Sequence, residues 1–223
     1  MRSDYKRVWT TLSESLSSAK MHVSGTEDEA IFEESGAGTS EFLLTNVGIN
    51  ATDVVLEIGC GVGRVGKHLA ARCGRWIGAD VSPNMLAFAA DRLRDFSNVE
   101  FVELAGNDLQ PISDNSIDVI YCTVVFMHLE GWDRYSYVLE ALRALRPGGK
   151  LYVDNVNLCT DTGWSIFETH RKFPLSQRPD HITVCSTPQE LQEYLKRAGF
   201  EQIETYAGSE LIAVWGRKPT ASH

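Results

Sequence analysis

Residues 54–63 read Val54-Val55-Leu56-Glu57-Ile58-Gly59-Cys60-Gly61-Val62-Gly63. The apolar residues, several of them β-branched, predict a buried strand that stops where three glycines occupy alternate positions. The next eight residues, 64–71, predict the start of a helix. Such a strand–turn–helix places bare backbone N–H groups beside an open crevice, and glycine lets a ligand approach the main chain closely. The stretch therefore predicts a cradle for a nucleotide-type cofactor.

From residue 53 onward, segments with strand patterns alternate with segments with helix patterns. Strands are expected at 54–58, 76–79, 99–104, 117–122 and 150–155, and helices at 64–72, 83–93, 132–145 and 191–198. Two further strands, 201–206 and 211–216, flank the turn Ala207-Gly208-Ser209-Glu210 and predict a terminal hairpin. This order predicts an α/β fold, a doubly wound and mostly parallel seven-stranded sheet with a C-terminal antiparallel hairpin.

The remaining segments predict additions to that sheet. Apolar residues spaced by three and four predict an amphipathic helix over 4–23, and a second helix is expected from Thr39 to Val47 after a Gly- and acid-rich loop at 24–38. We therefore expect an N-terminal helical cap or lid at 1–50 and a cofactor-binding domain at 51–223. Within that domain, residues 158–185 form a long insert that is expected to shape the substrate site.

Composition narrows the choice of partners. The 223 residues include 30 acidic and 21 basic side chains, a net charge of -9, which argues against a nucleic-acid partner. No apolar run approaches the ~20 residues of a membrane span, and the N-terminus lacks the apolar core of a secretory signal. These features predict a cytoplasmic protein without a membrane partner. The five cysteines form no C-x-x-C pair, so no metal is expected. The oligomeric state is not predicted.

Polar residues follow the predicted strands at the edge where such sheets bind ligands. Asp80 lies 21 residues after Gly59, which suits a carboxylate that accepts hydrogen bonds from ribose hydroxyls; Ser82 is the better cap for the next helix. Asn107 and Asp108 are candidates for reading adenine, with an Asx turn as the alternative. Glu57, inside an apolar strand, either makes a water-linked contact with a cationic ligand or accepts from neighbouring loop N–H groups.

Four motifs, taken in order, resemble those of the class I S-adenosylmethionine-dependent methyltransferases. They are Glu57–Arg64, Ile77–Ser82 with Met85 beyond it, Asp114–Ile120, and Leu142–Leu151 with its Arg146-Pro147-Gly148-Gly149 passage. The resemblance covers about Val54 to Lys218 and implies a Rossmann-like sheet that binds S-adenosylmethionine and releases S-adenosylhomocysteine. It departs from the family at Ala105, where many members carry an acidic residue.

The resemblance also implies roles for individual residues. The glycines back the methionine part of the cofactor, Asp80 takes the ribose, Val81 and Met85 flank the adenine, and Thr123 faces the methionine end. The expected cofactor-binding residues are Glu57, Gly59, Gly61, Gly63, Arg64, Asp80, Val81, Met85, Asn107, Asp108, Leu109 and Thr123.

The resemblance implies transfer of a methyl group to an O or N atom of a small organic molecule by in-line displacement. The alternatives are a methyltransferase that acts on a protein or nucleic acid, and a non-catalytic S-adenosylmethionine-binding protein. A general base is needed only where the acceptor keeps its proton, and His128 and Asp154 are the candidates. The expected substrate-binding residues are Trp9, Phe126, Asn155, Trp164, His170 and His181.

Overall fold

The computed structural model describes residues 4–220; residues 1–3 and 221–223, the outer ends of the two predicted regions, lie outside the described residues. A seven-stranded sheet has the order β3-β2-β1-β4-β5-β7-β6. Its strands are β1 (Val54–Ile58), β2 (Arg75–Asp80), β3 (Val99–Glu103), β4 (Ile117–Cys122), β5 (Leu145–Val156), β6 (Glu201–Ala207) and β7 (Leu211–Arg217). Strands β1 to β5 pair in parallel, and β7 lies antiparallel between β5 and β6. The predicted sheet and its closing hairpin are confirmed.

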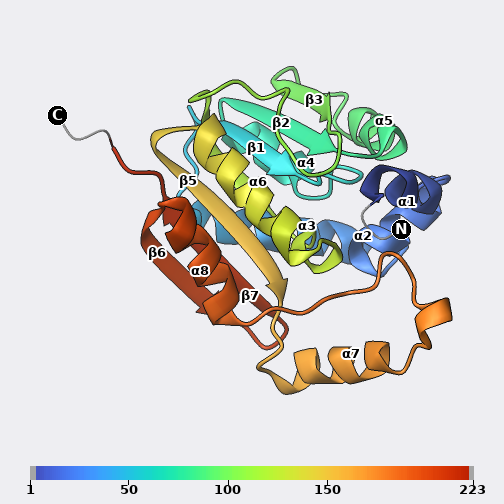
Figure 1. The fold of residues 1–223 in the computed structure, drawn as a ribbon. Coiled ribbons are helices and arrows are strands. Elements are labelled where there is room, and N and C mark those ends of the chain that lie inside the picture. Colours follow the sequence, from blue (N-terminus) through green and yellow to red (C-terminus); the bar gives the residue numbers. More distant parts are fainter. Residues whose placement is uncertain (1–3, 221–223) are drawn as a thin grey trace.

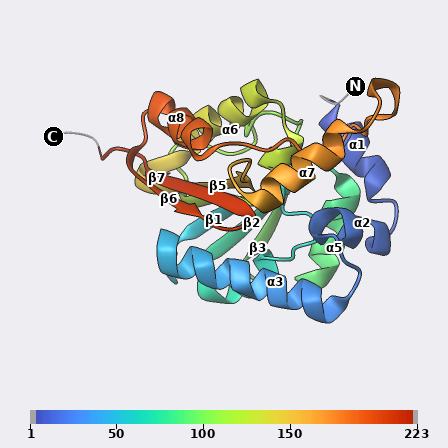
Figure 2. The same cartoon turned by 90° about the horizontal axis from the view of Figure 1, so that it is seen from below.

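Helices cover both faces of the sheet (Figure 2). They are α1 (Tyr5–Leu12), α2 (Leu16–Ser24), α3 (Glu29–Phe42), α4 (Gly66–Leu69), α5 (Pro83–Arg92), α6 (Gly131–Ala144), α7 (Asp161–Arg171) and α8 (Pro188–Ala198). The apolar faces of α6 and α8 pack on one side of the sheet, with Leu56 and Ile120. Residues of α4 and α5 pack on the other side, around Val55 and Trp76.

The order of the strands reverses at β1. The chain steps outward from β1 to β2 and β3, then crosses to the other side of β1 to form β4 and β5. Loops that follow β1 and β4 therefore lead away from each other and leave a crevice at the carboxyl edge of the sheet. Helices α1 and α2 lie beyond that edge, as Figure 1 shows.

The N-terminal segment differs from its prediction. The single helix expected over 4–23 is two helices, with Ser15 capping the second. The prediction of a loop at 24–38 is wrong, because α3 already begins at Glu29. The Asp28 side chain caps this helix by accepting from the N–H groups of Ala30 and Ile31. Gly36 does not break this helix: a Cβ there would lie 2.4 Å from the Arg64 carbonyl oxygen, so glycine permits close packing.

The second half of the chain differs in smaller ways. The insert at 158–185 contains α7, whose first turn is capped by Thr160. At the start of α8 the Thr187 hydroxyl accepts from the Glu190 N–H group, which is one of the two hydrogen bonds of a capping box. The Glu190 carboxylate instead accepts from Arg134 and Tyr194, because α6 packs beside the start of α8.

Candidate active site

A cavity lies at the point where the strand order reverses. The space between its walls, open mouth included, is about 750 Å³. Its wall is built from the loops that follow β1, β2, β3 and β4, and from one side of α1 and α2. The cavity therefore joins segments that are far apart in the sequence.

The glycine loop forms one wall and is fixed by its neighbours. The φ angles of Gly59, Gly61 and Gly63 are +71°, +52° and +79°, and a Cβ on Gly59 would lie 2.3 Å from Val125 Cγ2. The N–H groups of Gly59 and Cys60 donate to the Ala79 carbonyl at 2.7 and 3.0 Å. The sequence predicted bare N–H donors in this loop. The donors of Gly59 and Cys60 are instead paired, because β2 ends directly beside the loop. A ligand would meet the Cα faces of the glycines rather than these N–H groups.

Asp80 joins the ends of β1 and β2. Its side chain is 7% exposed, and its two oxygens accept from the N–H groups of Gly61 and Ser82, both at 2.9 Å. Burial raises the pKa of Asp80 to about 6, against the lowering effect of those hydrogen bonds, so the carboxylate is mostly ionised at neutral pH. The Ser82 hydroxyl caps α5, as predicted. Asp80 lines the cavity with Val81 and Met85.

Glu57 and Arg64 lie beneath the glycine loop. Glu57 is buried, and its partner is the Tyr121 hydroxyl at 2.5 Å rather than a loop N–H group. Burial raises the pKa of Glu57 to about 8. The Nη1 of Arg64 donates to the hydroxyls of Ser35 and Thr39, while its buried Nε finds no acceptor among the described residues. Both residues belong to the wall of the cavity.

Only part of the segment after β3 reaches the cavity. Leu104 and Gly106 line it, whereas Asn107, Asp108 and Leu109 do not. The Asp108 side chain accepts from the Gln110 N–H group at 3.2 Å, which is the Asx-turn alternative. Leu109 is buried in the core beneath α6. The chain turns away after Gly106, whose φ of +145° a side chain would strain.

Asp154 lies beneath the site rather than in it. Its oxygens accept from the Thr123 hydroxyl and the Val124 N–H group, both at 2.6 Å, and from the Tyr152 hydroxyl at 3.1 Å. It is 1% exposed and does not line the cavity. These bonds hold the turn after β4, where Val124 has a φ of +61°. Thr123 lines the cavity, so Asp154 positions a wall residue.

His128 reaches the cavity from the short 3-10 helix Phe126–His128. Its Nδ1 lies 2.8 Å from the His181 carbonyl oxygen. A carbonyl only accepts, so Nδ1 carries a proton, and the lone pair of the neutral ring sits on Nε2. The His128 ring meets Trp9 edge-on, with ring centroids 4.9 Å apart. The insert thus sets the tautomer of the candidate base.

Arg134 of α6 fastens the loop that carries His128 to the returning part of the insert. Its Nε donates to the Phe126 carbonyl at 2.8 Å and its Nη2 to the Val184 carbonyl at 2.9 Å. Its Nη1 donates to Ser186 and Glu190. Phe126 packs in the core, and the buried Asn155 side chain donates to Val184 and Ser186. Phe126 and Asn155, both predicted to bind substrate, therefore lie behind the cavity wall and support it.

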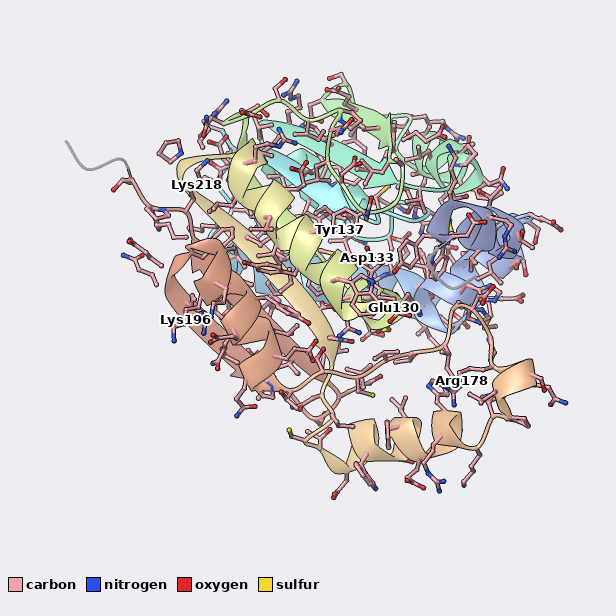
Figure 3. The ribbon with its side chains drawn as sticks, viewed as in Figure 1. Glu130, Asp133, Tyr137, Arg178, Lys196 and Lys218 are labelled. Carbon is pink, nitrogen blue, oxygen red and sulfur yellow. The ribbon has the colours of Figure 1, made fainter. Side chains whose placement is uncertain are left out.

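The N-terminal helices close the mouth of the cavity. Trp9, a predicted substrate-binding residue, lines the cavity together with Tyr5, His22 and Val23. The sequence did not predict these three as site residues, because helical spacing alone does not show which side chains face a cavity. The Tyr5 hydroxyl donates to Asp133 at 2.6 Å and accepts from the Glu130 N–H group at 3.0 Å. Figure 3 shows Glu130 at the start of α6, followed by Asp133 and Tyr137 along the helix.

The insert contributes less to the wall than expected. Trp164 is 52% exposed, and α7 stands apart from the sheet in Figure 1. The His170 ring bonds to the Thr183 carbonyl at 3.3 Å and does not line the cavity. His181 borders it indirectly, through its bond to His128 and its edge-on contact with His22, centroids 5.4 Å apart. Of the three insert residues predicted to bind substrate, His181 is the one that lies next to a wall residue.

Residues 4–220 contain neither a metal-binding cluster nor a membrane-spanning helix. No group of three or more His, Cys, Asp or Glu side chains in that range is arranged to hold a metal ion. No helix there is long and apolar enough to cross a membrane.

Comparison with known proteins identifies the family. The model of a methyltransferase domain matches residues 56–153. Over 153 residues the chain is 35% identical to a probable S-adenosylmethionine-dependent methyltransferase of Mycolicibacterium smegmatis, covering 68% of this chain and 53% of that protein. The chain belongs to the class I S-adenosylmethionine-dependent methyltransferases. Methyltransferase GfsG of Streptomyces halstedii is also 35% identical, over 126 residues, 55% of this chain and 45% of that protein.

A solved methyltransferase shares the fold. A Thermotoga maritima S-adenosylmethionine-dependent methyltransferase, described as a possible histamine N-methyltransferase, superposes with a TM-score of 0.66 at 21% identity, covering 89% of this chain and 98% of that one. The chain spans about half the length of the curated relatives cited above. The methyltransferase-domain match includes the loops after β2, β3 and β4 but neither α1 and α2 nor the insert.

Proposed function

We propose that this protein transfers a methyl group from S-adenosylmethionine to a small organic molecule. The observation that carries the proposal is the single cavity that joins the glycine loop and Asp80 to the segment after β4 and the N-terminal helices. One space thus offers a place for a methyl donor beside a place for an acceptor. A donor and an acceptor held together need mainly correct positioning to react.

The residues of the first half fit the cofactor. The glycine loop leaves no Cβ to obstruct a ligand, Asp80 is an ionised carboxylate, and Arg64 keeps an unsatisfied buried donor. In the proposed complex Asp80 accepts the ribose hydroxyls, and Val81 and Met85 flank the adenine. Bound S-adenosylmethionine supplies an activated methyl group, so the protein orients the acceptor and excludes water.

Calorimetric titration and an assay of methyl transfer test this function. We expect saturable binding of both S-adenosylmethionine and S-adenosylhomocysteine to folded protein, and transfer of labelled methyl to a small acceptor. Folded protein that binds neither ligand would overturn the proposal. Binding without transfer to any acceptor would favour a non-catalytic binding protein instead.

Proton release on binding tests the role of Glu57. With a pKa of about 8, Glu57 is mostly protonated at neutral pH, and a cationic ligand beside it would favour the ionised form. Binding is therefore expected to release a proton, and affinity is expected to rise with pH between about 6 and 8. The measurement is calorimetric titration of S-adenosylhomocysteine in buffers with different heats of ionisation.

Glu57→Gln provides the comparison, since an amide keeps the size of the side chain and does not titrate in this range. Its binding heat should depend less on the buffer than that of the unmodified protein. An identical buffer dependence in both proteins would show that the proton comes from another group.

A further inference from the structure

The insert carries large apolar side chains that the fold does not bury. Helix α7 stands apart from the sheet in Figure 1, and the short 3-10 helix Leu175–Gln177 follows it. Gly163 is the only buried residue of α7, and the 3-10 helix has none. The exposed apolar residues of the insert are Trp164, Phe167, Phe173, Leu175 and Val184. The packing of residues 4–220 therefore leaves apolar surface of this segment in contact with water.

Cations accompany this apolar surface. The stretch Arg171-Lys172-Phe173-Pro174-Leu175-Ser176-Gln177-Arg178, here called the basic turn, is exposed at every residue. It holds three cations and no carboxylate, whereas the whole chain has a net charge of -9. Arg171 pairs with Glu168 of α7 at 2.9 Å, but within residues 4–220 neither Lys172 nor Arg178 forms a salt bridge. The basic turn is thus a positive region on an acidic protein.

Aromatic rings continue from α7 into the basic turn. Trp164 and Phe167 lie about one helical turn apart, and their ring centroids are separated by 5.2 Å. The rings of His170 and Phe173 follow, with centroids 6.3 Å apart. Beyond them Leu175 is 83% exposed. Aromatic side chains of this kind are favoured where an apolar phase meets water.

An anionic lipid surface fits this combination of charge and apolar surface. Phe173 and Leu175 can enter the boundary between headgroups and acyl chains, which removes their apolar surface from water. Lys172 and Arg178 are attracted to anionic headgroups, and their long side chains let the charge stay at headgroup level. A nucleic acid would attract the cations but would leave Leu175 in water, and the net charge of -9 would repel it.

We propose that the insert binds the surface of an anionic membrane, with Phe173 and Leu175 between the headgroups and Lys172 and Arg178 beside the lipid phosphates. The contact is peripheral and reversible, because a few apolar side chains and two cations do not anchor a protein stably. The sequence predicted no membrane partner because no apolar run is long enough to span a bilayer. A peripheral contact needs no such run. It also does not depend on the transferase activity.

Sedimentation with lipid vesicles tests the proposal. The full chain is mixed with vesicles of phosphatidylcholine alone, or of phosphatidylcholine with about 30% phosphatidylglycerol. We expect binding to the anionic vesicles to be at least about tenfold tighter, and to weaken as salt rises from about 0.05 to 0.5 M. Absence of binding to the anionic vesicles, or equal binding to the neutral ones, would overturn the proposal.

A double variant tests the apolar part of the contact. Phe173→Ser with Leu175→Ser is expected to weaken binding to the anionic vesicles about tenfold or more. Both side chains are exposed, so the variant is expected to keep its fold, which circular dichroism checks. Trp132→Ser with Leu139→Ser is the matched control, since it removes one aromatic and one aliphatic side chain from the exposed surface of α6. Equal losses in the two double variants would contradict the proposed contact.

A second double variant tests the charges. Lys172→Ala with Arg178→Ala is expected to weaken binding to the anionic vesicles about tenfold and to reduce its salt dependence. Arg94→Ala with Lys196→Ala removes two exposed cations elsewhere and should change the affinity less than about twofold. Full binding by the Lys172 and Arg178 variant would exclude these cations from the contact and overturn the proposal.

Two other occupants of the basic turn would give different results. Sedimentation velocity without lipid would show a dimer that the Phe173 and Leu175 variant separates, if a second copy of the chain covered this surface. Titration with duplex DNA would show binding that depends on Lys172 and Arg178, if the partner were a nucleic acid. Either result would overturn the proposal.

Discussion

Replacing Asp80 with alanine is expected to weaken the binding of S-adenosylmethionine and S-adenosylhomocysteine by roughly 100-fold, or about 3 kcal/mol. The substitution removes two charge-assisted hydrogen bonds that the carboxylate would accept from the ribose. It also frees the N–H groups of Gly61 and Ser82, which now fix the edge of the cavity. Calorimetric titration of both ligands measures the effect.

The pH dependence of cofactor binding is a second test of the role proposed for Asp80. Its raised pKa of about 6 means that the carboxylate gains a proton in the folded protein at a pH where an exposed aspartate stays ionised. A protonated carboxyl group accepts ribose hydroxyls poorly, so affinity is expected to fall as the pH drops through about 6. Unlike the Glu57 effect, this loss should persist in Glu57→Gln.

Asp91→Ala is the matched control for Asp80→Ala. The Asp91 side chain lies on α5, is 78% exposed, and pairs only with the nearby Arg94 among the described residues. Its removal is expected to leave both affinities unchanged within about twofold, as usual for exposed ion pairs. Equal affinities for Asp80→Ala and Asp91→Ala would contradict the assignment of Asp80.

Replacing Arg134 with alanine is expected to lower the free energy of unfolding by about 3–5 kcal/mol. The guanidinium is 2% exposed and donates to two carbonyls, a hydroxyl and a carboxylate. Alanine would leave the buried Phe126 carbonyl without this donor, remove one donor from the Val184 carbonyl, and open a cavity beneath the loop that carries His128. Denaturant unfolding measures the loss.

Arg94→Ala is the comparison for Arg134→Ala. Arg94 is 69% exposed, and its removal is expected to change the free energy of unfolding by less than about 0.5 kcal/mol. We also expect Arg134→Ala to spare S-adenosylhomocysteine affinity more than methyl transfer, because Arg134 holds the loop that carries His128 rather than the glycine loop and Asp80. A loss of stability as small as that of Arg94→Ala would mean that water replaces the guanidinium without cost.

Secondary structure could be predicted from the sequence where the residues of one segment are enough to specify it. The run from Val54 to Gly63 predicted a strand, a turn and a helix start because burial, left-handed backbone and helix spacing leave traces in neighbouring residues. Asp80 was predictable for the same reason, since it ends one strand at a regular distance from the glycines. The same reasoning failed at Gly36, which resembles a helix breaker in sequence but lies inside α3, where it packs against Arg64.

The sequence by itself determined the order of strands and helices along the chain, the glycine loop after β1 and the place of Asp80 at the end of β2, since each depends on residues close together in the chain. Only the tertiary structure decided which polar residues reach the cavity. It buries Asp154 under the turn after β4, brings His22 to the mouth, and sets the His128 tautomer through a carbonyl 53 residues away. Such contacts depend on how segments far apart in the sequence pack together. This packing produces no periodic residue pattern within any single segment, so the sequence of that segment does not reveal it.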